Sequence, residues 1–484
     1  MTTAPAQRWR RRVPDTATTD GAPKLARRLG RIDLTAMGVG TIVGAGIFVI
    51  TGVAAAEKAG PSIVLSFVLA GTVCVLVALC YSELAAMVPV SGSAYTYTYA
   101  TLGEGPAFLV GWNLLLEFVI AGAAVAIGWS GTTVSALDSM FGITVPHAIA
   151  AGPAEGGIVN LPAVLIIGVI VAVLVGEVSL TAKITKALVG VTIGVLVLVV
   201  AVGAPHIDVQ NWTPFAPFGF SGIIGGAAIA FFAFLGFDVV AASAEEARNP
   251  RRDVPFAIIG TVLIATLLYA LVSAVLTGIA PFATLNNGAP IATAFSGLHI
   301  GWIGNVIVIA SVIALTKGLL LIVYAQVRLS FAMCRDRLLP FGLAQTGKRS
   351  TPVRLTLILG VFCAAIAGLL PIDIVVELVN IGALSAFAVV CVGVLVLRRA
   401  EPDRERPFRT PLVPFVPILA LVGCVLLATT LDGLTWVRFA VWVLIGIAVY
   451  LGYSRKRSTH PGPARGILKI NPQPIGRMGG FGRV

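Results

Sequence analysis

The sequence predicts an all-α polytopic membrane protein with twelve transmembrane helices. Its 484 residues are 57% hydrophobic and only 12% charged, whereas a soluble domain is about 25% charged. Many apolar runs exceed the roughly 18 residues that are needed to cross a bilayer. Two of these runs, the first and the sixth, carry glycines near their centres, and glycine is costly inside a helix. These observations set the class of the protein and point to where its helices are interrupted.

The apolar runs and the polar stretches between them define the spans and the domains. The predicted spans are residues 35–57, 61–87, 105–134, 160–177, 181–204, 221–244, 255–279, 300–333, 353–370, 373–397, 411–431 and 433–453. The chain is divided into a basic tail (1–33), a first set of five spans (34–204), a second set of five spans (205–398), two trailing spans (399–454) and a second basic tail (455–484).

The basic residues predict the orientation. With the N-terminus inside, 31 of the 34 Lys and Arg residues fall in the tails and in the inner connections. The long outer connections near 138–159, 205–220 and 280–299 contain none. Because Lys and Arg accumulate on the cytoplasmic side, we expect a multi-pass protein of the plasma (inner) membrane with both termini cytoplasmic. The net charge of +12 is then a topology signal, and no nucleic-acid partner is expected.

Motifs of other protein classes are missing from the sequence. The chain contains no HExxH, GxSxG or phosphate-binding lysine motif, and its four histidines and six cysteines form no metal-ligand spacing. We therefore expect no enzymatic activity, no metal and no cofactor. No repeated selectivity filter or ring of charges favours a channel. The short tails show no signalling domain, so we do not expect a transport-like sensor.

The first span carries four glycines within nine residues, from Gly38 to Gly46. Each costs about 1 kcal/mol in a helix relative to alanine. One explanation is close helix packing through Gly40 and Gly44. The other is a helix that unwinds at Gly44-Ala45-Gly46, where free N–H groups suit a carboxylate and free carbonyls, near Ile42 and Val43, suit an ammonium group.

The sixth span offers a matching interruption. Its central residues are Phe231-Phe232-Ala233-Phe234-Leu-Gly236-Phe-Asp238. Interrupted spans in corresponding positions of two halves are a sequence signature of a transporter binding site. The phenylalanines could equally pack in the core, as aromatic stripes usually do.

Four motifs carry a resemblance to a known family. They are Gly38-Val-Gly-Thr-Ile-Val-Gly-Ala-Gly-Ile-Phe-Val-Ile-Thr-Gly52, Phe231 to Asp238 followed by Glu245-Glu-Ala-Arg-Asn-Pro-Arg-Arg-Asp-Val-Pro255, Gln326-Val-Arg-Leu-Ser-Phe-Ala-Met-Cys-Arg-Asp-Arg-Leu-Leu-Pro340, and Arg406-Pro-Phe-Arg-Thr-Pro411. In their order and spacing the chain resembles the cationic amino acid transporter family of the amino acid–polyamine–organocation superfamily, over about residues 35 to 455.

The resemblance implies a five-plus-five inverted repeat with broken helices 1 and 6, plus two trailing helices. It also implies that the substrate carboxylate and amine bind at the two breaks, and that protons drive uptake. Heteromeric relatives use a single-span partner subunit, but nothing in this chain indicates one. The expected partners are an amino acid substrate and the lipid bilayer.

Charged residues inside spans are costly and so are candidates for function. Glu117 lies near the middle of span three, where the family places an acid beside the substrate; it could also be protonated or paired with a helix neighbour. Asp238 follows the span-six break and could cap or pair locally. Glu245 and Glu246, with Arg248, are expected to form ion pairs of a gate or loop.

Lys317 is the one basic residue deep inside a span, about 16 Å from the inner end at 1.5 Å per residue. Proton-coupled members of the resembled family carry a lysine in span five, but this chain has Val191 or Thr192 there. We expect Lys317, beside Thr316, to occupy the cation site and to bond span-one carbonyls near Ile42 or Val43. Burial favours the neutral amine, so Lys317 could release a proton. A permanent tether, as in a sodium- and proton-independent exchanger, and an unrelated pairing, for example with Glu117, are the alternatives.

The substrate is predicted less sharply than the transporter class. The motifs resemble those of arginine, lysine and ornithine carriers, and Glu117 could meet a basic side chain. The same carboxylate could lie near the α-amine of a neutral amino acid. We expect a cationic substrate, with small neutral amino acids as the main alternative.

Overall fold

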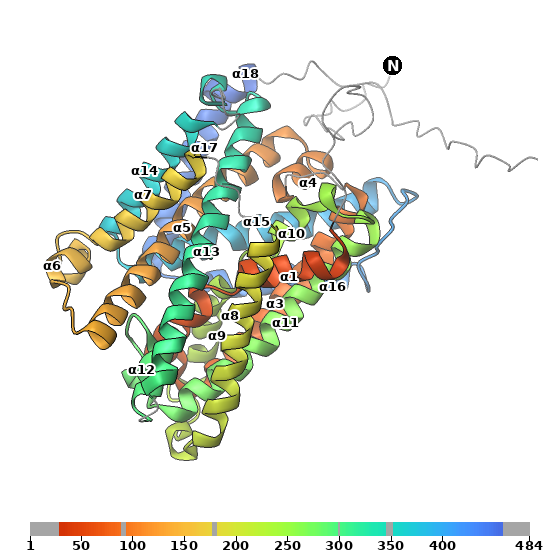
Figure 1. The fold of residues 1–484 in the computed structure, drawn as a ribbon. Coiled ribbons are helices and arrows are strands. Elements are labelled where there is room, and N and C mark those ends of the chain that lie inside the picture. The colour runs from red at the N-terminus through yellow and green to blue at the C-terminus, as the bar shows by residue number, and fades with distance from the viewer. Residues whose placement is uncertain (1–28, 89–92, 177–181, 299–300, 345–351, 458–484) are drawn as a thin grey trace, which may run out of the picture.

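The computed structural model describes residues 29–88, 93–176, 182–298, 301–344 and 352–457, and every structural statement below concerns these residues. Within them the helices are joined by turns and loops, and the one β-type pairing is an isolated parallel bridge between Leu29 and Ala247. The helices form one elongated bundle, with long helices running between its two ends (Figure 1).

The α-helices follow one another along the chain. They are α1 (Arg31–Ile42), α2 (Thr51–Ala54), α3 (Ile63–Met87), α4 (Ser93–Thr101), α5 (Glu104–Phe141), α6 (His147–Ala150), α7 (Leu161–Val175), α8 (Ala182–Gly203), α9 (Gly219–Ala230), α10 (Asp238–Ala242), α11 (Pro250–Ile279), α12 (Pro290–Ser296), α13 (Gly301–Arg335), α14 (Val353–Leu369), α15 (Ile372–Ala400), α16 (Phe415–Thr429), α17 (Gly433–Val449) and α18 (Arg455–Arg457).

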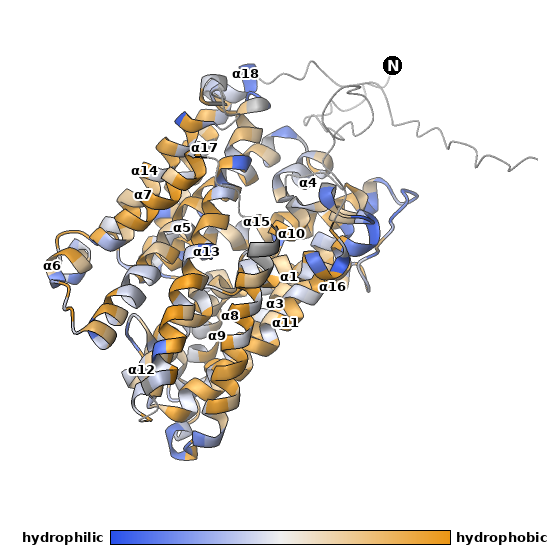
Figure 2. Cartoon of the chain, viewed as in Figure 1, coloured by the Kyte–Doolittle hydropathy of each residue, from blue (hydrophilic) through white to orange (hydrophobic). Residues whose placement is uncertain are grey.

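Most of these helices suit a membrane. Eight helical segments of the described chain are long and apolar enough to cross one, and α7, α14 and α16 are shorter apolar helices. Figure 2 shows hydrophobic residues along the long helices and hydrophilic residues gathered toward the ends of the bundle. The protein is therefore a polytopic membrane protein. The count of twelve spans and the inverted repeat stay predictions.

Two segments interrupt their helices where the glycines predict it. Helix α1 ends at Ile42, and Val43 is extended before the chain turns helical again at Ala45 and continues as a π-helix, η1 (Gly46–Ile50). Helix α9 passes into a short 3₁₀ helix, η7 (Phe231–Phe234), which ends before α10 begins at Asp238. Between them Gly236 has φ of 110°, a conformation that favours glycine.

The first break differs in detail from the prediction. Unwinding was expected at Gly44-Ala45-Gly46, but the unwound residues are Val43 and Gly44, whereas Ala45 and Gly46 already belong to the second helical half. Gly46 is needed for packing, because a Cβ there would lie 2.3 Å from Ala233 Cα. Gly40 likewise packs closely on Val189. Unwinding and close packing therefore both account for the glycines of this span.

Around the breaks, two groups of helices form the framework. Helix α5 packs along α13 and α15, and α11 packs along α3 and α1. Their interior side chains are buried, including Phe67, Tyr81, Phe108 and Phe387. The breaks in the first and sixth spans thus lie inside a packed helical framework that can hold them in place.

Candidate functional site

The two helix breaks lie against each other. Gly46, just after the first break, is in close contact with Ala233 of η7. Gly236, inside the second break, packs on Thr41 near the end of α1. The two interruptions that the sequence places almost two hundred residues apart therefore form one site.

Free space adjoins the first break. A Cβ built on Gly44 would meet no atom within 4 Å. The first N–H groups of the helical half that begins at Ala45 have no acceptor within their own helix, because a helix start always leaves such groups. Ala45 itself clusters with Phe232 and with Ile120 and Ala121 of α5. The site therefore combines anion-binding backbone groups with an apolar surrounding.

Tyr269, on α11, joins the two breaks. Its hydroxyl lies 3.0 Å from the carbonyl oxygens of both Ile42 and Ala233, so its single proton is shared between these two acceptors. Its ring packs on Phe234, with a centroid distance of 5.3 Å. The sequence reasoning missed Tyr269, although a single tyrosine hydroxyl within an apolar span is a usable signal, since buried phenols take hydrogen-bond partners.

Asn380, on α15, is a second residue that the sequence reasoning missed. Its Nδ2 donates to the carbonyl of Ala228 at 2.7 Å, just before α9 passes into η7. Nearby, the Phe231 ring packs on Phe387 at 5.9 Å. Phe231 and Phe234 thus pack in the core, as one of the two explanations held, while Phe232 belongs to the buried apolar cluster that also contains Ala45. Direct contact of these rings with substrate stays a prediction.

Glu117 is buried in α5, with 3% of its surface exposed. Its Oε2 has no hydrogen-bond partner among the described residues. Across from it, α15 comes close, because a Cβ on Gly382 would lie 3.8 Å from Glu117 Cβ. A carboxylate oxygen without a partner at such a depth is available to a ligand or a proton.

Asp238 begins α10, directly after the second break. Its Oδ2 accepts a hydrogen bond from Ser93 Oγ at 3.1 Å, and Ser93 Oγ lies 3.0 Å from the Tyr81 hydroxyl. This arrangement agrees with local pairing, one of the two roles expected of Asp238. It ties the far side of the break to α4 and α3.

Lys317 is buried in α13, with 2% exposed, and its Nζ has no hydrogen-bond partner among the described residues. The expected bond to a span-one carbonyl is therefore absent, and the Ile42 carbonyl is instead engaged by Tyr269. No ion pair joins Lys317 to Glu117 in the part of the chain that the structure describes. Thr316 accepts from Trp129 Nε1 at 2.9 Å and donates to Val312.

The loop after α10 meets the start of α1. The Leu29 N–H donates to the carbonyl of Glu246, and the Arg248 N–H donates to the carbonyl of Leu29, at 3.0 and 2.8 Å. The Glu245 side chain lies outside the described residues. Side-chain ion pairs of Glu245, Glu246 and Arg248 stay a prediction, while the backbone pairing already ties the two broken spans together at this end.

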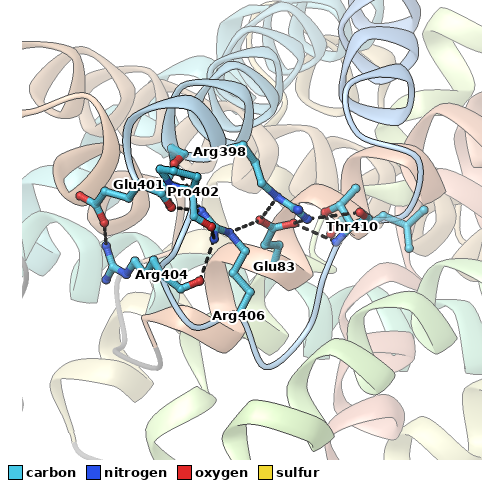
Figure 3. A network of polar contacts seen from close by, with 9 residues as sticks. Glu83, Arg398, Glu401, Pro402, Arg404, Arg406 and Thr410 are labelled. Atoms are coloured by element: carbon cyan, nitrogen blue, oxygen red, sulfur yellow. Dashed lines mark hydrogen bonds and ion pairs between the residues drawn. The ribbon is translucent and has the colours of Figure 1, made fainter.

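A second polar cluster lies at the end of the bundle where α15 leaves it (Figure 3). The Glu83 carboxylate is 1% exposed and pairs with Arg398 at 2.8 Å and with Arg406 at 3.2 Å. It also accepts from the Thr410 N–H at 2.8 Å. Arg406 donates in addition to the carbonyls of Leu397 and Glu401, at the end of α15. The Glu83 charge is thus paired within the cluster, although Arg406 Nε contacts it as an ion pair without a hydrogen bond. We interpret the cluster as a structural joint, because it connects α3 to the end of α15.

Comparisons with known proteins identify the family of this chain. The model of the amino acid permease family matches residues 29–451. The chain is 42% identical to the methylthioribose transporter of Bacillus subtilis, over 93% of this chain and 98% of that protein. It is 44% identical to a branched-chain amino acid permease of Bacillus subtilis, over 91% and 96% of the two chains. It is also 37% identical to a vacuolar cationic amino acid transporter of Arabidopsis thaliana, over 79% and 65%.

These matches span both breaks and nearly the full set of helices. The names of the family and of these relatives indicate a transporter rather than an enzyme, and a location in a membrane. The chain therefore belongs to the amino acid permease family of the amino acid–polyamine–organocation superfamily.

Proposed function

We propose that this protein carries amino acids across the plasma membrane by alternating access, as a secondary transporter. The observation that carries the proposal is the pair of helix breaks in contact inside the bundle, with free space at Gly44. Discontinuous helices of this kind present backbone groups to substrates at the centre of transporters.

The backbone groups give the substrate an orientation. The carboxylate binds the N–H groups at Gly44, Ala45 and Gly46, where a helical half begins and its dipole is positive. The amine faces carbonyls of the break between Phe234 and Gly236. Tyr269 supports this arrangement, because it holds the carbonyls of Ile42 and Ala233 at a fixed separation.

The surroundings favour a neutral aliphatic substrate over the cationic one that the motifs favour. Ala45, Phe232 and Ile120 belong to one buried apolar cluster, and such surroundings suit an apolar side chain. A relative with 44% identity is named as a branched-chain amino acid permease. A cationic substrate is the second candidate, because the unpartnered Oε2 of buried Glu117 could accept a basic side chain.

Uptake into proteoliposomes tests this proposal. Radiolabelled leucine is the substrate, and isoleucine, alanine, arginine, lysine and methylthioribose are the competitors. We expect leucine uptake that saturates and is competed by isoleucine, but not by arginine or lysine. Strong competition by arginine that disappears in Glu117→Gln would select the cationic candidate. Uptake is then repeated with radiolabelled arginine and alanine, and a failure of all three amino acids to be taken up would overturn the transporter proposal.

Lys317 is proposed to act in proton coupling. Its ammonium is buried without a partner beside Thr316, so its charge is available to change during the transport cycle. In Lys317→Ala we expect uptake to lose its response to a proton gradient while exchange of internal for external substrate continues. Proton-coupled uptake that survives unchanged would exclude Lys317 from coupling. Wild-type uptake without any response to the gradient would favour the tethered exchanger.

Both termini are proposed to be cytoplasmic, on the strength of the basic residues in the tails and inner connections. A single cysteine introduced by His460→Cys reports the side of the C-terminal tail. The six native cysteines are buried, so they give little background. We expect an impermeant maleimide to label the variant only in opened cells. Labelling in intact cells would reverse the orientation.

A further inference from the structure

A groove outside the amino acid site runs along the first half of α11. It has a volume of about 720 Å³. Its walls come from one face of α11 and from the connection between α15 and α16. The lining residues are Arg251, Arg252, Pro255, Phe256, Ile259, Gly260, Leu263, Ile264, Pro407 and Phe408. All of them except the two arginines are apolar or glycine.

The groove has the length of one membrane leaflet. Its α11 residues recur in neighbouring pairs every four positions, so they share one face of the helix. The thirteen steps from Arg251 to Ile264 correspond to about 20 Å at 1.5 Å per residue. Half of a bilayer's hydrocarbon core is about 15 Å. Phe256 and Leu263 are 53% and 52% exposed, so this face is open to the surrounding membrane.

Positive charge is confined to one end of the groove. Arg251 and Arg252 begin α11, and the Arg31 guanidinium lies over the Phe256 ring, 5.5 Å from its centroid. The pairing of Arg251 with Glu405 is loose, at 3.7 Å, with both side chains more than half exposed. Such exposed pairs contribute little, so the guanidinium remains available to another anion.

The opposite wall of the groove is held rigidly. Pro407 and Phe408 follow Arg406, whose guanidinium is bonded to Glu83 and to the carbonyls at the end of α15. Thr410, which follows them, also binds Glu83 (Figure 3). The groove is thus built between a helix face and an anchored loop.

We propose that this groove binds an anionic phospholipid. The phosphate and headgroup bind Arg251 and Arg252, and an acyl chain lies along Phe256, Ile259 and Leu263. The separation of charge and apolar surface along the groove matches the separation of headgroup and tail in a lipid. Clustered arginines at a membrane surface attract anionic headgroups. In the proposed orientation this is the cytoplasmic leaflet.

Native mass spectrometry of the full-length protein tests this site. The protein is exchanged into detergent with dioleoyl phosphatidylglycerol or dioleoyl phosphatidylcholine, and bound lipid is counted against lipid concentration. We expect preferential binding of phosphatidylglycerol. Arg251→Gln with Arg252→Gln should weaken it roughly thirtyfold, taking about 1 kcal/mol for each arginine. Arg455→Gln with Arg457→Gln removes two arginines from a different basic segment of that side, away from the groove lining, and should leave the binding unchanged.

A variant that is expected to strengthen lipid binding distinguishes loss of the site from misfolding, because a misfolded protein would not bind more tightly. Glu405→Gln removes the acidic neighbour of Arg251 and should tighten phosphatidylglycerol binding by about twofold, as expected for an exposed pair. Equal loss in both arginine double variants, or no preference between the two lipids, would overturn the proposal. So would an added mass equal to a second copy of the chain that disappears in Arg251→Gln with Arg252→Gln, since that would assign the groove to a dimer interface.

Discussion

Two regions of this protein bury charge, and they do so in opposite ways. Glu83 is 1% exposed and is bonded by Arg398, by Arg406 and by the Thr410 N–H. Lys317 is 2% exposed, and its Nζ has no partner among the described residues. The first charge lies where helices end, and the second lies in the middle of a helix that packs beside the broken spans.

The difference separates charges that build the fold from charges available for transport. A buried ion with its partners in place stabilises the conformation that holds it. A buried ion without partners raises the free energy of that conformation. A transporter needs groups of the second kind, because a change in their protonation or ligand must shift one conformation relative to another. Glu117, with its unpartnered Oε2, belongs with Lys317 in this respect.

Removal of Glu83 gives the largest expected effect. Glu83→Ala leaves Arg398 and Arg406 without their carboxylate, and the loss of one partner from a buried ion pair costs about 3–5 kcal/mol. We expect loss of the monodisperse protein in detergent, or a much lower Tm. Glu401→Ala is the control, because its pair with Arg404 is partly exposed and should contribute under about 1 kcal/mol. Equal Tm values for the two variants would show that the Glu83 cluster is not a structural joint.

Gly44 in the first break and Gly46 directly after it form a matched pair for the second-largest expected effect. At Gly46 a Cβ would lie 2.3 Å from Ala233 Cα, whereas at Gly44 it would meet nothing within 4 Å. Gly46→Ala should push the breaks apart and cost about 1–3 kcal/mol, the usual range for overpacking. We expect a lower Tm and little uptake. Gly44→Ala should keep the wild-type Tm and raise the KM for uptake, because the added methyl occupies the free space.

The opposite pattern in that pair would contradict the site. An unchanged Tm in Gly46→Ala would mean that the breaks do not depend on their contact. An unchanged KM in Gly44→Ala would mean that substrate does not use the space beside that residue.

The sequence predicts the helical class and the positions of both breaks, because both follow from local properties. These are the length of an apolar run and the free-energy cost of glycine within a helix. It was less accurate within the first break, since Gly46 serves a contact with Ala233 that no local rule reveals. The convergence of Arg398, Arg406 and Thr410 on Glu83 likewise depends on how α3 and α15 pack, which no local pattern reveals.

The candidate site residues also divide into those that the local sequence reveals and those whose role depends on packing. Glu117 and Lys317 were found because a charge inside an apolar span is visible in the sequence. Tyr269 and Asn380 were missed because their importance lies in the carbonyls that they bind, at Ile42, Ala233 and Ala228. The expected bond from Lys317 to span one is absent, and the hydrogen bond that the Ile42 carbonyl does accept, from Tyr269, comes from a residue that the sequence did not single out.

Replacing Lys317 should affect stability in the direction opposite to replacing Glu83. Lys317→Met keeps a similar side-chain length and removes a buried charge without a partner, so we expect a Tm equal to or above that of the wild type. Uptake should lose its response to a proton gradient. Lys58→Met, which removes an exposed lysine, should change neither property. A marked drop in the Tm of Lys317→Met would instead reveal a stabilising partner and would place Lys317 with Glu83.

The smallest expected effect tests the link between the two breaks. Tyr269→Phe removes the hydroxyl that binds the carbonyls of Ile42 and Ala233 and leaves the ring packed on Phe234. A hydrogen bond contributes about 0.5–1.5 kcal/mol, so we expect a small drop in Tm and roughly a fivefold loss in kcat/KM for uptake. Tyr453→Phe, at the far end of the chain, is the control. If Tyr269→Phe transports like the wild type, the carbonyls at the breaks are positioned by the packing of Gly46 on Ala233 alone, and the hydroxyl has no part in holding the substrate site.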